Sequence, residues 1–308
     1  MKVDAVFEGG GVRGIAFVGA VQMLEHAGFH WHRLAGTSSG SIVAGMLAAG
    51  YNGKELEKIM SQLQLPQLLK KEWIHYVPYL GKNLRLLVKK GIYKGTGLEN
   101  WLNQHLMHKG IQTFADLPPD RLKVIISNIS TQQMMVWPDD LLKIGKEPGE
   151  ISVAFAIRIS CALPFFFEPV PLKLEGQVNW LVDGGVTSNY PVWLFDQPTK
   201  PRWPTFGFRV ATKGSAPNST MRITHFFSYM KAILATMRDA HDERYVQSMD
   251  ALRTIFIPTG SIRATQFSLS EEEQHWLIEQ GREAAERFLF DWSFPVYQAR
   301  QEERYRPV

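Results

Sequence analysis

The sequence predicts an α/β fold, because short apolar segments that favour β-strands alternate along the chain with segments that favour helices. Within the first fifty residues the same unit occurs twice: a strand-like run leads through glycines into a helical run, which a further glycine ends. Of the 308 residues, 45% are hydrophobic and 21% are charged, as in an ordinary soluble globular protein. A chain of this length can bury one large core, so we expect one domain.

Both units and the later strands can be placed along the chain. The first unit has a strand over residues 3–7 and a helix over residues 13–27. The second has a strand over residues 29–35 and a helix over residues 42–49, with the segment GTSSG between them. The later strands are expected over residues 122–127, 181–182, 205–210 and 253–257.

The C-terminal part begins with a helix signal and ends in a run of charges. Ser270 and Glu273 form a capping box for a helix. After Tyr297 the sequence reads QARQEERYRPV, which we expect to be frayed. The predicted organisation is one domain over residues 1–296, with its core motifs within 3–215 and a helical part over 216–296, and a flexible charged tail over 297–308.

Targeting signals, cysteine pairs and metal motifs are missing from the sequence. No apolar run approaches eighteen residues, and the opening MKVDAVFEGGG lacks the apolar stretch and cleavage site of a signal peptide. The lone Cys161 excludes an internal disulfide and a cysteine-cluster metal site, and no acids and histidines have ligand spacing. We therefore expect a cytoplasmic protein with no metal and no other cofactor.

Positive charge is concentrated over residues 70–94, although the net charge of the chain is only +4. Seven lysines and arginines stand there against the single acid Glu72, with aromatic and leucine side chains between them. That mixture is typical of a segment that lies on an anionic lipid surface, and nucleic acid could use the same charges. The alternative is a solvated helix face whose aromatic side chains point into the core.

The segment Gly36-Thr37-Ser38-Ser39-Gly40 has the GxSxG pattern of a nucleophile elbow and lies between an expected strand and an expected helix. Glycines on both flanks leave room for the sharp turn that exposes the serine. The N-terminus of the following helix favours the negative charge that develops during attack. A plain glycine- and serine-rich loop is the alternative.

A second glycine turn, Gly9-Gly10-Gly11-Val12-Arg13-Gly14, also joins a strand to a helix. Its backbone N–H groups could form an oxyanion hole. The same residues fit the GxGxxG dinucleotide fingerprint, which requires an acid near the end of the second strand. Residues 29–35 (FHWHRLA) contain none, which disfavours nucleotide binding.

Ser38 needs a base to activate it, and no histidine is an evident candidate. The nine histidines are scattered along the chain, and none has the sequence context of a catalytic triad. Asp183 is the better candidate, since it ends the apolar Leu181-Val182 run and is followed by two glycines. An ordinary turn would explain Asp-Gly-Gly alone.

Taken in order, GGGVRG, GTSSG and Asp183-Gly184-Gly185 resemble the motifs of the patatin-like phospholipase family. The resemblance covers residues 3–215. Further matches to the family's AxRxSxAxP and NxP stretches are AIRISCALP at residues 156–164, with Ile159 where a small residue is commoner, and Asn189-Tyr190-Pro191.

The resemblance implies a three-layer α/β/α fold with a mainly parallel central sheet and a Ser-Asp dyad in place of a triad. The aspartate would take the serine proton directly, and the glycine loop would hold the oxyanion. The implied site residues are Ser38 and Asp183 for catalysis, Gly9, Gly10, Gly11 and Arg13 for the oxyanion hole, and Gly36 and Gly40 for the elbow.

The implied activity is hydrolysis of fatty-acyl esters of phospholipids or lysophospholipids through an acyl-enzyme, without calcium. An acyltransferase that uses the same dyad and a non-enzymatic lipid-binding protein are the alternatives. The expected partners are a phospholipid or other acyl ester and, through residues 70–94, the inner membrane surface in transient contact, with no nucleic acid. Whether that segment is a lid or a packed element, and which lipid is cleaved, stay open at this point.

Overall fold

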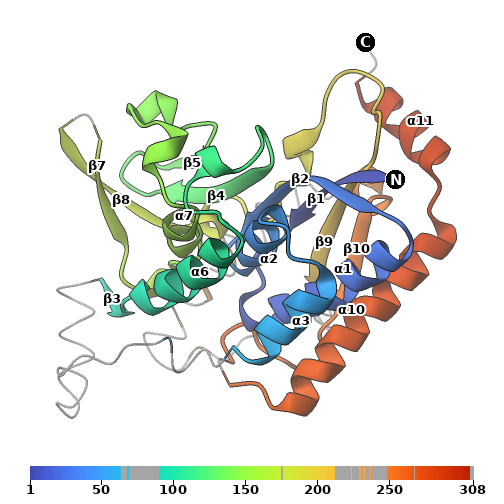
Figure 1. Ribbon diagram of the computed structural model, residues 1–308, viewed down its shortest axis with the longest axis horizontal. Helices are drawn as coiled ribbons and strands as arrows, with labels where there is room; N and C mark the ends of the chain where they lie inside the picture. The colour runs from blue at the N-terminus through green and yellow to red at the C-terminus, as the bar shows by residue number, and fades with distance from the viewer. Residues whose placement is uncertain are drawn as a thin grey trace.

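A central, mostly parallel β-sheet flanked by helices forms the body of the protein in a computed structural model (Figure 1). The structure describes residues 1–63, 68, 90–174, 176–211, 223, 229, 232–233, 236, 248–266 and 268–305. The α/β fold expected from the sequence is confirmed. In the described part of the chain the main sheet has the order β10 (Thr254–Pro258), β9 (Thr205–Ala211), β1 (Lys2–Phe7), β2 (His30–Thr37), β4 (Leu122–Asn128), β8 (Gln177–Asp183) and β7 (Val170–Leu174), and β5 (Gln133–Trp137) pairs with β4.

Strand β4 marks the change from parallel to antiparallel pairing. Neighbouring strands from β10 to β4 pair in parallel, whereas β5 and β8 both pair antiparallel with β4. Because β5 occupies one edge of β4 over residues 124–128, β2 and β8 must share the other edge. Strand β2 ends there with Thr37 opposite Ile125, and β8 ends with Asp183 opposite Ile126. The last residues of two strands far apart in sequence therefore meet end to end.

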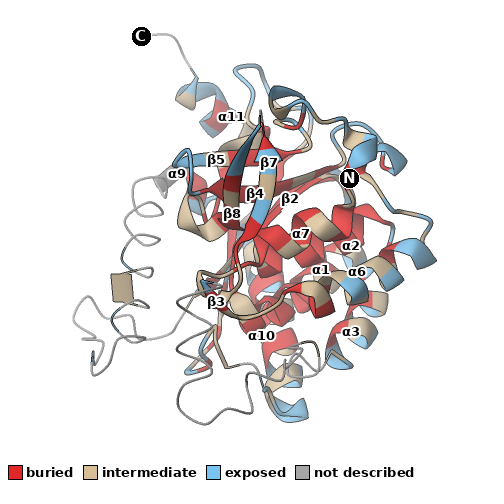
Figure 2. Cartoon of the chain, turned by 90° about the vertical axis from the view of Figure 1, so that its left-hand side faces the viewer, coloured by how far each residue is buried: buried red, intermediate tan, exposed pale blue. Residues whose placement is uncertain are grey.

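The main hydrophobic core lies between the sheet and the helices α1 (Ala16–His26), α2 (Ser39–Ala48), α7 (Val153–Ser160) and α10 (Glu271–Asp291), which gather on one face (Figure 2). Strand β1 shows the two-residue period of a buried strand. Ala5 and Phe7 point into this core, where the Phe7 ring stacks on Phe208 with centroids 4.4 Å apart. Val6 points to the other face and packs with Ala35 and Phe195.

All the strands expected from the sequence are present, and the Ser270–Glu273 capping box begins α10 as expected. Antiparallel strands β5 and β7 and the short pair β3 (Gly91–Tyr93) and β6 (Phe165–Phe167) were not expected. Within the described ranges, no helix is both long and apolar enough to span a bilayer. Among the described residues the structure also has the helices α3 (Gly53–Ser61), α6 (Thr96–His108), α9 (Ser248–Ala251) and α11 (Phe294–Arg304).

Most of the basic segment, residues 70–89, lies outside the described residues. Its last part is described: Lys90 is exposed with its Nζ 4.1 Å from the centroid of the Trp180 ring, and Gly91–Tyr93 form β3.

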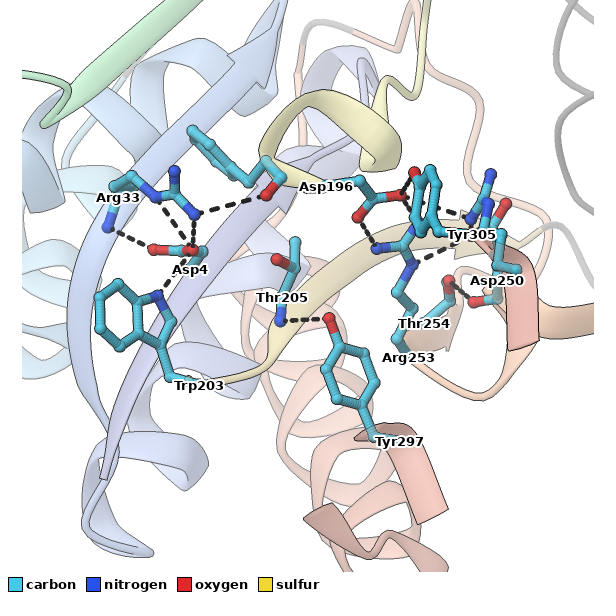
Figure 3. Close-up of polar contacts among 12 residues, drawn as sticks. Asp4, Arg33, Asp196, Trp203, Thr205, Asp250, Arg253, Thr254, Tyr297 and Tyr305 are labelled. Atoms are coloured by element: carbon cyan, nitrogen blue, oxygen red, sulfur yellow. Dashed lines mark hydrogen bonds and ion pairs between the residues drawn. The ribbon is translucent and has the colours of Figure 1, made fainter. Parts of the chain in front are cut away.

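The C-terminus differs from the flexible tail expected from residue 297 onward, because α11 continues to Arg304. Two residues of this charged segment, Tyr297 and Arg304, hold α11 to the rest of the fold, and their hydropathy does not indicate this. Tyr297 is buried, and its hydroxyl accepts a hydrogen bond from the Thr205 amide at 3.2 Å (Figure 3). Arg304 donates to Asp250 Oδ1 at 2.8 Å, so its charge is paired inside the fold.

Candidate active site

Ser38 occupies a sharp turn between β2 and α2. Its φ of 51° and ψ of −127° are unusual for a residue with a side chain. A Cβ atom on Gly36 would overlap the backbone of Gly40, and one on Gly40 would overlap the carbonyls of Phe7 and Glu8. The two glycines are therefore required by close approach of the backbone, as the GxSxG pattern suggested.

Asp183 meets Ser38 at the junction on β4 where β2 and β8 end. The Ser38 hydroxyl donates a hydrogen bond of 2.7 Å to Asp183 Oδ2, and the Gly185 amide donates one of 2.8 Å to Oδ1. Asp183 is 4% exposed, whereas Ser38 is half-buried and open to solvent. A buried carboxylate in hydrogen-bond contact with an accessible hydroxyl has the geometry that general-base activation of a nucleophile requires.

Ser160 holds the turn through its hydroxyl group. Its hydroxyl accepts a hydrogen bond from the Ser38 amide at 2.9 Å and donates one to the Ile125 carbonyl at 2.6 Å. The amide of a backbone-strained residue is thus satisfied inside the protein. Sequence reasoning assigned Ser160 no role, although the AxRxSxAxP match contains it.

The glycine loop lies beside the turn with most of its amides engaged. Gly9 donates to the Asn189 carbonyl at 3.2 Å, Gly10 to Ser39 Oγ at 3.0 Å and Val12 to the Ala264 carbonyl at 3.1 Å. Gly11 has a φ of 58°, and no acceptor for its N–H occurs among the described residues. Of the three glycines expected to form the oxyanion hole, Gly11 is therefore the one whose amide is open to a ligand.

Arg13 is buried directly after this loop and donates from Nε to the Gly10 carbonyl at 3.3 Å. Its side chain thus contacts the backbone of the loop that was expected to form the oxyanion hole. Helix α2 starts at Ser39, so its positive N-terminal end lies next to Ser38.

Cys161 is the other potential nucleophile near the turn. Burial and, to a smaller extent, the charge of Asp183 raise the pKa of its thiol, while the hydroxyls of Ser41 and Ser38 oppose the shift. The thiol stays protonated at neutral pH, and a protonated thiol is a poor nucleophile. This favours Ser38 as the reactive group.

Histidine and metal chemistry find no support in the described part of the chain. There, no histidine is hydrogen-bonded to Ser38 or Asp183, and no three or more His, Cys, Asp or Glu side chains lie close enough to hold a metal ion. His32 lies elsewhere, with its Nδ1 3.3 Å from Asp4 Oδ1 near the start of β1.

Comparison with known proteins gives consistent results. The family described as Patatin-like phospholipase matches residues 5–196. The uncharacterized protein YqhO of Bacillus subtilis is 37% identical over 294 residues, which cover 96% of this chain and all of YqhO. The cUMP-AMP-activated phospholipase of Escherichia coli is 23% identical over 84% of this chain and 79% of its own.

Among solved structures, VipD from Legionella pneumophila has a similar fold, with a TM-score of 0.57 at 17% identity. The match covers 93% of this chain, which spans 66% of the VipD chain. At this identity the likeness concerns the fold alone.

Proposed function

The chain belongs to the patatin-like phospholipase family, and on that premise we propose that it is a serine acyl hydrolase that cleaves fatty-acyl esters of phospholipids or lysophospholipids. The observation that carries the proposal is the 2.7 Å hydrogen bond from the Ser38 hydroxyl to Asp183, made on a strained turn that the glycine loop contacts through Gly10. Among the described residues, a nucleophile, a base and an oxyanion donor are then all present.

In the proposed mechanism Asp183 takes the proton as Ser38 Oγ attacks the ester carbonyl. The carbonyl oxygen becomes an oxyanion, and the tetrahedral intermediate collapses with release of the alcohol, which takes up the proton. Water then attacks the acyl-enzyme with Asp183 again as base, which releases the fatty acid and restores Ser38. The site is reset without any other group.

The Gly11 amide and the N-terminus of α2 are the proposed stabilisers of the oxyanion. Gly9, Gly10 and Arg13 would act by shaping the loop, because the Gly9 and Gly10 amides are already bonded and Arg13 holds the Gly10 carbonyl.

The deciding experiment compares the wild-type protein, Ser38→Ala and Asp183→Asn on a mixed phospholipid extract, with and without calcium, by mass spectrometry of the products. We expect calcium-independent release of fatty acid and lysolipid by the wild type and none by either variant. Ser61→Ala, an exposed serine on α3, is the matched control and should behave as the wild type. Substantial turnover in Ser38→Ala or Asp183→Asn would remove the dyad.

Two further arms separate the alternatives. A fluorophosphonate probe should label Ser38, and failure to label it would favour a lipid-binding protein. An added acyl acceptor should leave the products unchanged, and a new acylated product would identify an acyltransferase.

We also propose that the membrane is approached through the end of the basic segment. Half-buried aromatic rings gather beside the exposed Lys90: Phe166 lies 5.0 Å from Tyr93 and 4.9 Å from Phe167 between ring centroids. Strand β6 begins three residues after Ala162, whose carbonyl accepts a hydrogen bond from the Asp183 amide at 3.0 Å, so the segment that carries Phe166 and Phe167 starts next to the proposed base. Aromatic and basic side chains together suit an anionic lipid interface.

Charge reversal at Lys89 and Lys90 should therefore weaken binding to anionic vesicles at low salt, as measured by vesicle sedimentation. Lys89 is outside the described residues. The control is Lys54→Glu/Lys58→Glu, the same total charge change at two exposed positions on α3. Equal binding by the two proteins would assign the segment to packing.

A further inference from the structure

Asn189 is buried between the two loops that flank the proposed dyad. Its main-chain carbonyl accepts the hydrogen bond from the Gly9 amide at 3.2 Å, and its side-chain Nδ2 donates to the Gly9 carbonyl at 3.2 Å. Both polar groups of the Gly9 backbone are thus held by one residue. Asn189 follows Asp183 by six positions, so it belongs to the loop of the base, whereas Gly9 belongs to the loop of the oxyanion.

The side chain fills the space that the two glycine motifs leave. A Cβ atom on Gly9 would overlap Asn189 Oδ1, and one on Gly185 would lie 2.9 Å from the same atom. Real side chains essentially never approach so closely, so both positions exclude larger residues while Asn189 is present. The distance between the loops is therefore set by one carboxamide.

Glu8 holds the carboxamide in place from the other side. Glu8 Oε1 accepts from Asn189 Nδ2 at 3.2 Å and from Arg209 Nε at 3.3 Å, and Oε2 accepts from the Val210 amide at 2.9 Å. Glu8 is 5% exposed. The network connects the glycine loop to β9, and within it Nδ2 serves as donor to both Glu8 and Gly9.

We propose that Asn189 is a positioning residue that fixes the glycine loop, and through it the Gly11 amide, relative to Ser38 and Asp183. This role rests on the proposed hydrolase function. Gly9 is clamped by Asn189 and Gly10 by Ser39 Oγ, so the peptide that presents the Gly11 N–H has little freedom. Preorganised donors stabilise an oxyanion without reorganisation during the reaction, and a misplaced donor loses that advantage.

Asn189→Asp tests the role because it keeps the size and the main-chain contact but removes the donor to the Gly9 carbonyl. We expect kcat for a soluble ester to fall about a hundredfold with little change in KM, because a shift of about 1 Å at a catalytic group has that effect. Labelling of Ser38 by a fluorophosphonate, which also develops charge on an oxygen, should slow by a similar factor. Asn179→Asp, at a buried asparagine bonded to Asn128, is the matched control for a new buried carboxylate.

The double variant Glu8→Gln/Asn189→Asp separates positioning from stability. Its glutamine at position 8 can donate to its aspartate at position 189 while its oxygen accepts from the Val210 amide, so the contact between the two side chains is restored. Arg209 Nε then loses its acceptor, as it does in Glu8→Gln alone, and the Gly9 carbonyl still lacks its donor. We expect the midpoint of unfolding to recover to that of Glu8→Gln and kcat to remain low. If Asn189→Asp does not fold, the double variant is compared with Glu8→Gln. The kcat of the double variant should then be about a hundredfold lower than that of Glu8→Gln.

Recovery of kcat together with stability would reduce Asn189 to a structural role and overturn the inference. So would wild-type kcat in Asn189→Asp while the wild type labels at Ser38. A wild-type protein that neither labels nor hydrolyses any ester would overturn the proposed function, and the positioning role with it.

Discussion

Carboxylates are buried at both ends of the sheet, but their hydrogen-bond partners differ. At the carboxyl end of β2, Asp183 accepts from the Ser38 hydroxyl and the Gly185 amide, which are neutral donors. At the amino ends of β1, β9 and β10, buried aspartates are bonded to arginines (Figure 3). The arginines balance the charge of the second set, whereas the proposed chemistry depends on the contact between Asp183 and the Ser38 hydroxyl.

Arg253 is the centre of the charged end. It is fully buried, forms a bidentate pair with Asp196 at 2.5 and 2.9 Å, and donates from Nε to Asp250 at 3.0 Å. Burial lowers the pKa of its guanidinium, but the hydrogen bonds with Asp196 and the charges of both acids outweigh burial and raise it. Nearby, Arg33 binds Asp4 and lies over the Phe195 ring. Buried charge thus serves the fold at one end, and we propose that it serves chemistry at the other.

The largest effect is expected on the activity, from a substitution at the end of the sheet that holds Asp183. Asp183→Asn should lower kcat/KM by about a thousandfold or more, because the proposed base is lost. Its unfolding midpoint should change by no more than about 2 °C, since a buried charge is replaced by a neutral group of the same shape. Ester turnover and calorimetry on the same sample check both numbers. A large loss of stability would place Asp183 with the structural carboxylates.

Arg253→Met should have the opposite signature. Two buried aspartates lose Arg253 and keep only the weaker contacts from the end of α11, which is expected to lower the free energy of unfolding by about 3–5 kcal/mol. The folded fraction should keep its specific activity. Urea unfolding followed by circular dichroism measures the first quantity, and turnover per folded molecule the second. Unchanged stability would contradict the assigned role of the cluster.

Arg304→Ala tests how far the charged end depends on α11. Arg304 is partly exposed and adds one hydrogen bond to Asp250, so its loss should cost about 1–2 kcal/mol. Arg300→Ala, on the same helix but in an exposed pair with Glu303, should cost no more than about 0.5 kcal/mol. Equal effects in the two variants would show that α11 is not anchored through Arg304.

The smallest effect concerns His105 on α6, outside both ends. Burial and then the nearby His108 lower the pKa of His105 below 6.5. The folded state therefore binds the proton less well than the unfolded chain, so this contribution is complete above about pH 6.5 and is lost as the pH falls through the folded pKa. His105→Gln should flatten the decline of stability between about pH 7 and 5. An unaltered slope in urea unfolding would assign the decline to other groups.

The sequence predicted what local chemistry controls. Strands with an apolar pattern, the capping box at Ser270 and the strand-turn-helix context of Ser38 all depend on neighbours in the chain. Ser160 and Glu8 act on residues more than a hundred positions away or through partners on other strands, so no local pattern marks them. The pairing of Arg253 with Asp196 spans 57 positions and was equally invisible. The expectation of a flexible tail from residue 297 missed α11 for the same reason, because Arg304 of this helix bonds to Asp250, far away in the chain.

Strands β2 and β8 end on the same edge of β4, and this arrangement makes the spacing of Ser38 and Asp183 depend on strand register and not on loop length. The spacing between Ser38 and Asp183 is set by the hydrogen-bond ladder of β4, one rung apart, and does not depend on the length of any connecting loop. Insertions between the two strands are therefore compatible with the dyad, whereas a one-residue slip of β8 would turn Asp183 to the opposite face of the sheet. The proposed pair is thus a property of strand register, so it depends on the pairing of β8 with β4 and on no single loop.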